Sequence, residues 1–226
     1  MLSRLRSVFG QRSTATPGYR VVPLADYDAT LRVSLRYLPH HVQAAFAAAC
    51  AERLYPSYAG FLAATRRDDG GIVRQALDLA WEGAMAQAMP GVDSNALVER
   101  CVALIPSDGG DDVIPPHADD AIASAAYALQ AAAGLDNGEA GWAAQRVTDA
   151  LDNYLLSTEI DIDAAEAEQR VWHHPLIQAE VTRREDDLRQ LGDTSDWTSA
   201  VGIVRARAGA VSALPLDLLD HGDSRT

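Results

Sequence analysis

Lysine is absent from this 226-residue sequence, so arginine supplies all 19 of its basic side chains. A catalytic lysine Schiff base and the lysine of a phosphate-binding P-loop are therefore both excluded. The sequence also lacks the GxSxG, GxGxxG and HExxH motifs, and the repeated ExxH motif of di-iron helical bundles. These absences exclude most common catalytic frameworks, and we expect no cofactor.

Cysteine is scarce, since only Cys50 and Cys101 occur, each within an apolar pattern of helical spacing. Two reduced thiols in the core explain this better than a disulfide, and a zinc cluster of several cysteines is impossible. No apolar run approaches the roughly 20 residues of a membrane-spanning helix, and the first residues lack the apolar segment of a secretory signal. We therefore expect a cytoplasmic protein that does not enter the membrane.

Positive charge is in deficit, because 32 acidic residues face 19 basic ones, a formal net charge of −13. Such a surface repels phosphate groups on average, which argues against nucleic acid or an anionic membrane as a partner. The N-terminal stretch is the exception, where Arg4, Arg6 and Arg12 stand among apolar residues. We expect residues 1–25 to form a flexible basic arm, or else to dock on a partner or on the acidic body of another copy.

The apolar residues recur at spacings of three and four, and strict alternation is rare. This pattern predicts an all-α fold, a single-domain multi-helical bundle of about eight to nine helices. We expect the helical domain to span residues 26–210 and residues 211–226 to form a C-terminal tail. Caps, prolines and glycines mark the ends of the predicted helices. We expect a first helix from Asp26 or Asp28 to about Leu38, and a second over residues 40–55 that Pro39 opens. The further helices are expected near 72–88, 95–105, 117–133, 139–158, 163–171, 175–191 and 196–209.

Pro56 stands within an apolar stripe that runs from Ala47 to Leu62 at helical spacing. A proline inside a helix removes a hydrogen bond and clashes with the preceding turn, at a cost of about 3 kcal/mol. We therefore expect the helix to kink or restart at Pro56, with Tyr55 pushed toward extended geometry. Tyr55 and Tyr58 then cover a structural joint or, in the alternative interpretation, grip a ligand.

Several segments resemble the YjaG-like bacterial proteins, an uncharacterised all-helical family. They are ERLYPSYAGF at 52–61, DGGIVRQALDLAWE at 69–82, IPS at 105–107 and, more weakly, HPLIQAEVTRREDDLRQL at 174–191. The spacing between the first two segments makes the resemblance specific, and it covers about residues 39–191. The resemblance implies a single all-helical domain and supplies no catalytic residue.

A row of polar residues lies beside the apolar stripe of segment 72–84. Asp78 and Glu82 are like charges one helical turn apart, and they need a positive neighbour such as Arg74, or Arg53 or Arg100 from another helix. In the alternative, the two carboxylates join a third ligand to bind a metal ion or move a proton. The candidate site region comprises Glu52, Tyr55, Tyr58, Asp78, Trp81 and Glu82.

Segment 108–120 is rich in acidic residues, but their spacing does not fit the calcium-binding loop of an EF-hand. We assign no metal site there and interpret the acids as solvated loop residues and, at Asp119 and Asp120, as first-turn residues favoured by the helix dipole. The weak candidates for divalent-ion binding are Asp111, Asp112, His117 and Asp120.

The segment TRREDDLRQ at 182–190 offers charge pairs at four-residue spacing, Arg183 with Asp187 and Glu185 with Arg189. Pairs at this spacing are typical of a solvated helix face, which is what we expect here.

These observations favour a non-enzymatic helical binding or assembly protein whose partner is another protein or a small ligand. The alternative is a small metal-dependent or acid/base enzyme that uses Glu52, Asp78 and Glu82. A dimer is expected because alanine-rich helices can pack closely against a second copy. Unpartnered leucines in the tail add to this expectation: Leu214, Leu216, Leu218 and Leu219.

Overall fold

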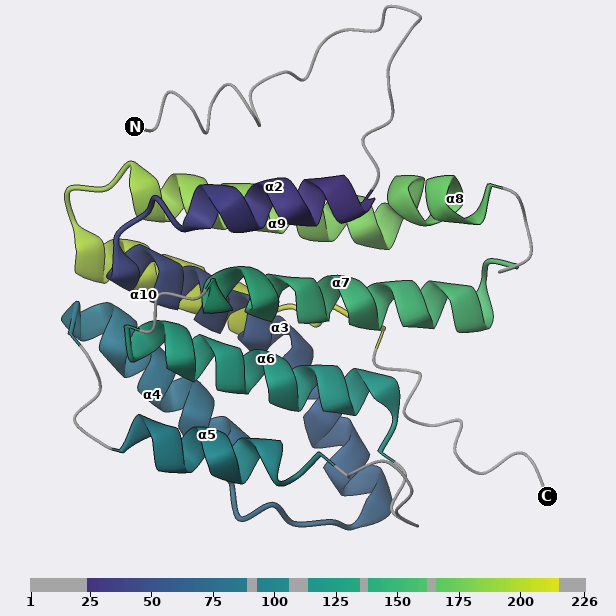
Figure 1. Cartoon of the computed structure of the whole chain (residues 1–226), viewed down its shortest axis with the longest axis horizontal. Helices are drawn as coiled ribbons and strands as arrows, with labels where there is room; N and C mark the ends of the chain where they lie inside the picture. Colours follow the sequence, from purple (N-terminus) through teal and green to yellow (C-terminus); the bar gives the residue numbers. More distant parts are fainter. Residues whose placement is uncertain (1–23, 89–92, 106–113, 135–137, 162–165, 216–226) are drawn as a thin grey trace, which may run out of the picture.

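Nine helices make up the described part of the chain, residues 24–88, 93–105, 114–134, 138–161 and 166–215 of a computed structural model (Figure 1). No strand occurs within these ranges, and the helices share one buried core, so the predicted all-α single domain is confirmed. The helices are α2 (Leu24–Leu35), α3 (His40–Thr65), α4 (Ile72–Ala86), α5 (Ser94–Val102), α6 (Pro116–Ala132), α7 (Glu139–Thr158), α8 (Ala167–His173), α9 (Pro175–Gly192) and α10 (Trp197–Gly209).

Helix α3 is the central element and contacts α4, α6, α7, α9 and α10. Alanines fill much of α3 and α6, and most of them are buried. Alanine favours helix formation, and its small side chain lets neighbouring backbones approach closely. Cys50 and Cys101 are both buried and unpaired in this core, as expected.

Pro56 does not end α3, so the predicted restart of the helix and the extended geometry of Tyr55 are wrong. One face of α3 beside the proline is buried, with Leu54 fully enclosed and Tyr58 at 2% exposure, while Pro56 itself is half-buried. Burial of such side chains contributes about 1.5–3 kcal/mol each, which offsets the proline penalty of about 3 kcal/mol. The hydroxyl of Ser57 also donates to the Leu54 carbonyl at 2.7 Å. Tertiary packing therefore overrides the local preference.

Helix α2 lies closely against α7, because Gly141 has no side chain at the crossing. A Cβ atom at Gly141 would stand 2.0 Å from Cγ of Arg32. The Arg32 guanidinium lies 4.2 Å from the centre of the Trp142 ring, and its Nη1 donates to Gln145 Oε1 at 2.9 Å. Helix α2 starts at Leu24, so neither Asp26 nor Asp28 is the cap that we predicted: Asp26 lies in the first turn and Asp28 is buried within the helix.

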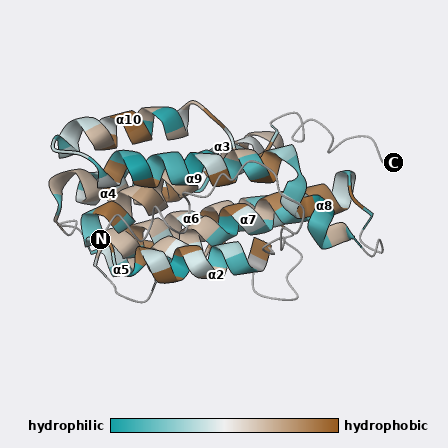
Figure 2. Ribbon diagram, turned by 90° about the horizontal axis from the view of Figure 1, so that it is seen from above, coloured by the Kyte–Doolittle hydropathy of each residue, from teal (hydrophilic) through white to brown (hydrophobic). Residues whose placement is uncertain are grey.

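Helix α9 carries hydrophilic residues along its length (Figure 2), yet it contacts α3, α7, α8 and α10. The predicted solvated face is wrong, because Arg184 and Asp187 are only 1% and 0% exposed. The predicted pairs are not those observed either: Arg183 lies 3.5 Å from Glu180, and Arg189 pairs with Asp186. Arg184 and Asp187 are bonded to charged side chains from other helices. Sequence spacing within one helix does not reveal such partners.

The ends of the chain are described in part. Residues 1–23 and 216–226 lie outside the described ranges, and with them most of the predicted arm and the leucines at 216, 218 and 219. Leu214 is 3% exposed and belongs to the buried core, so its side chain does have apolar partners within the chain. The amide of its neighbour Ala213 donates to the Arg53 carbonyl at 2.8 Å. Within the described ranges, no helix combines the length and apolar character needed to cross a membrane.

Candidate functional site

Four of the six predicted site residues meet around Arg74. Its Nη1 and Nη2 donate to the two carboxylate oxygens of Glu52 at 2.7 and 3.0 Å, and Nη2 also lies 3.0 Å from Asp78 Oδ1. The indole of Trp81 donates to Glu52 Oε2 at 2.9 Å, and the Arg74 guanidinium lies 4.9 Å from the centre of the Tyr55 ring. Sequence spacing therefore identified a real cluster.

Arginine side chains form ion pairs with the carboxylates of this cluster. Burial raises the pKa of Glu52, but the hydrogen bonds from Arg74 and Trp81 outweigh burial and hold that pKa below its ordinary value. Asp78 accepts from Arg205 at 2.9 Å in addition to its bond with Arg74. Bonded in this way, Glu52 and Asp78 form an ion-pair cluster that joins α3, α4 and α10, and Glu52 stays ionised.

The other two predicted site residues lie apart from this cluster. Tyr58 is buried, with its ring 6.4 Å from that of Phe61, and burial raises the pKa of its hydroxyl, with a further contribution from Asp69. Glu82 is exposed on the outer side of α4. Unlike Asp78, Glu82 has no ion-pair partner among the described residues.

The weak metal candidates are only partly described. Asp111 and Asp112 lie outside the described residues, and His117 is half-buried. Asp120 is not solvated as expected: it is 5% exposed and accepts from Arg146 at 3.2 Å. Across the described ranges, no group of three or more His, Cys, Asp or Glu is arranged to hold a metal ion.

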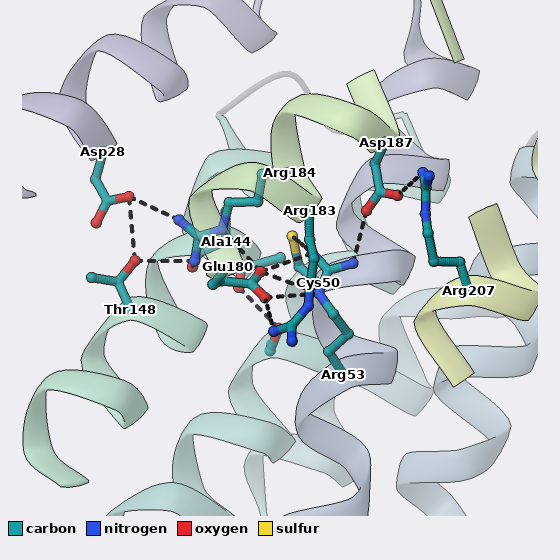
Figure 3. A network of polar contacts seen from close by, with 12 residues as sticks. Asp28, Cys50, Arg53, Ala144, Thr148, Glu180, Arg183, Arg184, Asp187 and Arg207 are labelled. Atoms are coloured by element: carbon teal, nitrogen blue, oxygen red, sulfur yellow. Dashed lines mark hydrogen bonds and ion pairs between the residues drawn. The ribbon is translucent and has the colours of Figure 1, made fainter. Parts of the chain in front are cut away.

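A buried ion network that we did not predict joins α2, α3, α7, α9 and α10 (Figure 3). Arg53 donates to Glu180 at 2.8–3.1 Å and to Asp187 at 2.7 Å. Arg184 donates to Glu180 at 3.2 Å and to Asp28 at 3.1 Å. The two guanidiniums therefore bridge three carboxylates from α2 and α9.

The network satisfies groups that would otherwise be costly to bury. Burial raises the pKa of Glu180, but Arg53 and Arg184 outweigh this and hold the pKa below its ordinary value, so the carboxylate stays charged. The Arg184 Nη2 also donates to the Ala144 carbonyl at 2.7 Å and to Thr148 Oγ1 at 3.0 Å. Asp187 gains a second partner from the edge of the network, Arg207. Buried charges are tolerated when they are paired and hydrogen-bonded in this way.

One sequence signal points to this network. Residues 177, 180, 184, 188 and 191 repeat at helical spacing, and all five are buried, as is 187. Charged residues thus occupy the core-facing positions of α9 between Ile177, Leu188 and Leu191. Such a stripe, matched with Arg53 inside the apolar stripe of α3, indicates a buried ion pair between the two helices.

An acidic pocket opens beside the network, between α2, α7 and α8. Its volume is about 300 Å³. The walls combine apolar residues with four carboxylates, and the residues that line it are Leu24, Asp28, Gln145, Thr148, Asp149, Asp152, Leu156, Ala167, Glu168 and Val171. We call this feature the acidic pocket.

Asp28 connects the acidic pocket to the buried network. Its Oδ1 atom accepts from Arg184 at 3.1 Å and from Thr148 at 3.3 Å (Figure 3). The residue is 7% exposed and lines the pocket, yet its Oδ2 atom accepts no hydrogen bond from any described residue. Burial raises the pKa of Asp28 despite the nearby Arg184. One oxygen of this largely buried carboxylate therefore has no hydrogen-bond donor among the described residues.

The remaining carboxylates leave the acidic pocket short of positive charge. Asp149 pairs with Arg146 at 3.0 Å, whereas Asp152 and Glu168 have no ion-pair partner among the described residues. Burial raises the pKa of Asp152, and the charges of Asp149 and Glu168 raise it further. An added cation would relieve this repulsion.

A second acidic hollow adjoins the pocket on the α6 side of α7. It has a volume of about 310 Å³ and shares Asp149 and Asp152 with the acidic pocket. Burial raises the pKa of Asp120 in this hollow to about 7, an effect that Arg146 only partly offsets. Arg146 pairs with both Asp120 and Asp149. This hollow therefore contains its own cation, and its carboxylates need an added positive charge less than those of the acidic pocket.

A larger hollow, of about 530 Å³, lies where α3 begins and α4 and α6 end. No aspartate, glutamate or arginine lines it, and its lining residues are Pro39, His40, His41, Ala44, Gly83, Gln87, Ala88, Ala132 and Gly134. His41 packs edge-on against Trp197, with 4.5 Å between ring centres. The charged groups of the acidic pocket indicate a class of ligand, whereas the lining of this larger hollow does not.

Comparison with known proteins places this chain in a family. Residues 30–207 match the sequence profile of a family described as a protein of unknown function, DUF416. The chain belongs to the DUF416 family. Its fold is similar to the crystal structure of a DUF416 family protein from Shewanella baltica OS155, with a TM-score of 0.66 and 18% identity over 80% of this chain and 95% of that chain. No curated protein matches the chain.

The DUF416 match spans the positions of three of the four carboxylates that line the acidic pocket. It includes Asp149, Asp152 and Glu168, but it starts at residue 30, so Asp28 and the preceding residues lie outside it. The expected likeness to an uncharacterised all-helical family is supported at the level of DUF416, and these comparisons do not support the narrower YjaG-like label. The family description assigns no activity to its members.

Proposed function

We propose that this DUF416 protein is a binding protein whose acidic pocket holds a cationic group, a guanidinium or ammonium on a short apolar stem. One observation carries the proposal: Asp152 and Glu168 have no cation among the described residues, and they share a pocket with the unused Oδ2 atom of Asp28. Carboxylates gathered in a partly buried pocket favour a bound cation, because each raises the free energy of the others when all are ionised.

The dimensions of the pocket support a small group. A volume of about 300 Å³ lies at the lower end of the range for ligand pockets, which is roughly 300–1,000 Å³. Leu24, Leu156 and Val171 provide apolar walls for methylene groups, while Asp28 supplies an acceptor at the network side. A single arginine or lysine side chain of a partner, or a small organic cation, has this combination of an apolar stem and a charged end.

Binding is favoured over catalysis at both acidic clusters. The lining of the acidic pocket contains no histidine, serine or cysteine, and its one hydroxyl, that of Thr148, donates to Asp28. The alternative enzyme would use Glu52, Asp78 and Glu82, but Arg74 bonds the first two and Glu82 lies exposed. A general base must reach the proton that it removes, and a carboxylate bonded to a guanidinium is poorly placed to do so.

Isothermal titration with N-acetyl-arginine amide tests the proposal, and N-acetyl-citrulline amide is the matched probe, of nearly the same shape and without charge. We expect saturable binding of the arginine probe and at least tenfold weaker binding of the citrulline probe. The double variant Asp152→Asn/Glu168→Gln should weaken binding of the arginine probe by about tenfold or more, since a charge-assisted hydrogen bond contributes about 1.5–3 kcal/mol.

The control variant is Glu82→Gln/Glu99→Gln, which removes the same charge from exposed positions outside the pocket. It should bind the arginine probe like the unaltered protein. Equal binding of the two probes, or equal loss in the two double variants, would show that the overall negative charge attracts the probe and that the pocket has no part in it.

A further inference from the structure

We infer that two copies of this chain associate through the outer face of α2, with their α2 helices antiparallel about a two-fold axis at the level of Leu31. The inference goes beyond the proposed binding function and does not depend on it, because no residue of this outer face lines the acidic pocket.

The outer face of α2 has an apolar centre. Val33 and Tyr37 are 56% and 66% exposed, and they are two of the four large apolar side chains that stand exposed among the described residues. Helix α2 lies at the outside of the bundle (Figure 2), and Leu31 and Leu35 on its inner side are buried in the core. At about 100° per residue, the exposed side chains of this segment fall within about 120° of the helix circumference. They are Asp26, Ala29, Thr30, Val33, Arg36 and Tyr37.

Opposite charges stand at the two ends of this face. Asp26 lies in the first turn, and Arg36 directly follows the last residue of α2. Neither side chain has an ion-pair partner among the described residues. The Arg36 guanidinium lies beside Gly138, the N-cap of α7, since a Cβ atom there would stand 3.2 Å from Arg36 Nη2. The α7 dipole also favours an anion at this point. Each end of the face therefore lacks the charge that the other end carries.

A second copy in the antiparallel orientation satisfies both ends at once. Residues at equal distances before and after Leu31 then lie level with each other, so Asp26 of each copy faces Arg36 of the other. By the same rule Ala29 faces Val33, where a small side chain leaves space for a larger one. A two-fold axis makes each of these contacts occur twice. This symmetry of the sequence favours another copy of the chain over a partner of different sequence.

The size of the face sets the strength of the dimer. A standard interface buries about 800 Å² on each partner and uses roughly 20–30 residues a side. One helix face with six exposed residues is smaller than this. We therefore expect a reversible dimer with a dissociation constant of about 1–10 micromolar, as suits a small interface.

Light scattering of full-length chains, from about 1 to 100 micromolar, tests the charged ends by charge reversal. The unaltered chain should pass from the mass of one chain toward twice that mass. Asp26→Arg and Arg36→Asp should each weaken association by about tenfold or more, because like charges then face each other at both ends. Glu99→Arg, an exposed reversal on α5, is the control and should associate like the unaltered chain.

An equimolar mixture of Asp26→Arg and Arg36→Asp tests the antiparallel arrangement itself. In a mixed dimer, the introduced arginine faces the introduced aspartate at one end, and the original Arg36 and Asp26 face each other at the other end. The mixture should therefore recover the association of the unaltered chain, although neither variant does so alone. A parallel arrangement, or a contact through another face, gives no such recovery.

The apolar centre has its own variant. Val33→Asp should weaken association by about tenfold or more, because it places two carboxylates near the axis. Ile203→Asp, at an exposed apolar position on α10, is the control and should leave association unchanged. Circular dichroism should show the original helix content in all these variants, because every altered position is exposed.

A single-chain mass throughout the series would overturn the inference. A dimer that neither the charge reversals nor Val33→Asp weaken would also overturn it, since the copies would then meet at another face. Loss of association in both reversals without recovery in their mixture would exclude the antiparallel pair. Binding of N-acetyl-arginine amide is a separate readout, so failure of the dimer leaves the proposed function of the acidic pocket as it is.

Discussion

Asp28 of α2 and Arg184 of α9 lie 3.1 Å apart, between Oδ1 and Nη1, although 156 residues separate them in the chain. This ion pair joins two features of the molecule. On one side, Arg184 shares Glu180 with Arg53 at the centre of the bundle. On the other side, Asp28 lines the acidic pocket. The position of the pocket's most buried carboxylate is therefore set by the network that fastens α9 to the rest of the fold.

Arg53→Met should lower the free energy of unfolding by about 3–5 kcal/mol, because it leaves the buried carboxylates of Glu180 and Asp187 without their shared cation. Arg189→Met is the control, since its pair with Asp186 is exposed, and it should cost less than about 1 kcal/mol. Urea denaturation followed by circular dichroism measures both. Similar values for the two variants would contradict a central role for the network.

Asp152→Asn should stabilise the protein at neutral pH, by a few tenths of a kcal/mol to about 1 kcal/mol. The raised pKa of Asp152 means that the folded state resists ionisation of this carboxyl, mainly because of burial and then because of Asp149 and Glu168. Below about pH 3 the carboxyl is largely protonated in both the folded and the unfolded state, so the variant should match the unaltered chain there.

As the pH rises above this value, the unfolded state releases its proton first, and the stability advantage of Asp152→Asn should grow and then level off. Thermal melts at several pH values measure this trend. The same substitution should weaken binding of N-acetyl-arginine amide, a trade of function for stability that is common at binding sites. A variant that is less stable at pH 7.5 would show that Asp152 has a partner in the folded protein.

Gly141→Ala should destabilise the protein by about 1–3 kcal/mol, because the new Cβ would overlap the Arg32 side chain and push α2 away from α7. Since Leu24 and Asp28 belong to α2, the acidic pocket should widen and its affinity for the arginine probe should fall. Gly202→Ala is the control on α10, where no atom lies within 4 Å of the added Cβ. Equal Tm values for the two variants would contradict close packing of α2 on α7.

Pro56→Ala should leave the free energy of unfolding within about 1 kcal/mol of the original or raise it, because α3 already continues through this position and alanine restores a backbone donor. Tyr58→Ala, two residues later, should lower it by about 3–5 kcal/mol, because the ring is 2% exposed. Denaturant unfolding compares the two. An unchanged stability for Tyr58→Ala would place this ring at the surface.

Self-association into a dimer remains a prediction from the sequence. Many of the alanines that motivated it, and Leu214, lie in the core of the single chain, so a dimer interface must use other residues. Among the described residues, large apolar side chains stand exposed at Val33, Tyr37, Val102 and Ile203. Light scattering over a concentration series should give twice the mass of one chain, and a constant single-chain mass at tens of micromolar would exclude the dimer.

Much of the fold was determined by the sequence, for a local physical reason. Apolar spacing of three and four residues, with caps, prolines and glycines at the ends, depends only on neighbours within a turn or two, so α4 and α7 could be placed from the sequence alone. The contact of Glu52 with Arg74 and Trp81 depends on how α3 packs against α4, but the same local rule placed Asp78 and Trp81 on one helix. It could also pair Asp78 with Arg74, because the two lie one helical turn apart.

Only the tertiary structure decided which charges are buried and what they contact. The partners Asp28 and Arg184 are 156 residues apart, and a charged residue looks the same in a sequence whether it faces water or a partner on another helix. The restart expected at Pro56 was wrong for the same reason, because burial of one face of α3 outweighed a local penalty. The acidic pocket likewise depends on tertiary packing: Asp28, Asp152 and Glu168 come from three helices, and only the packing of these helices brings their carboxylates to one pocket.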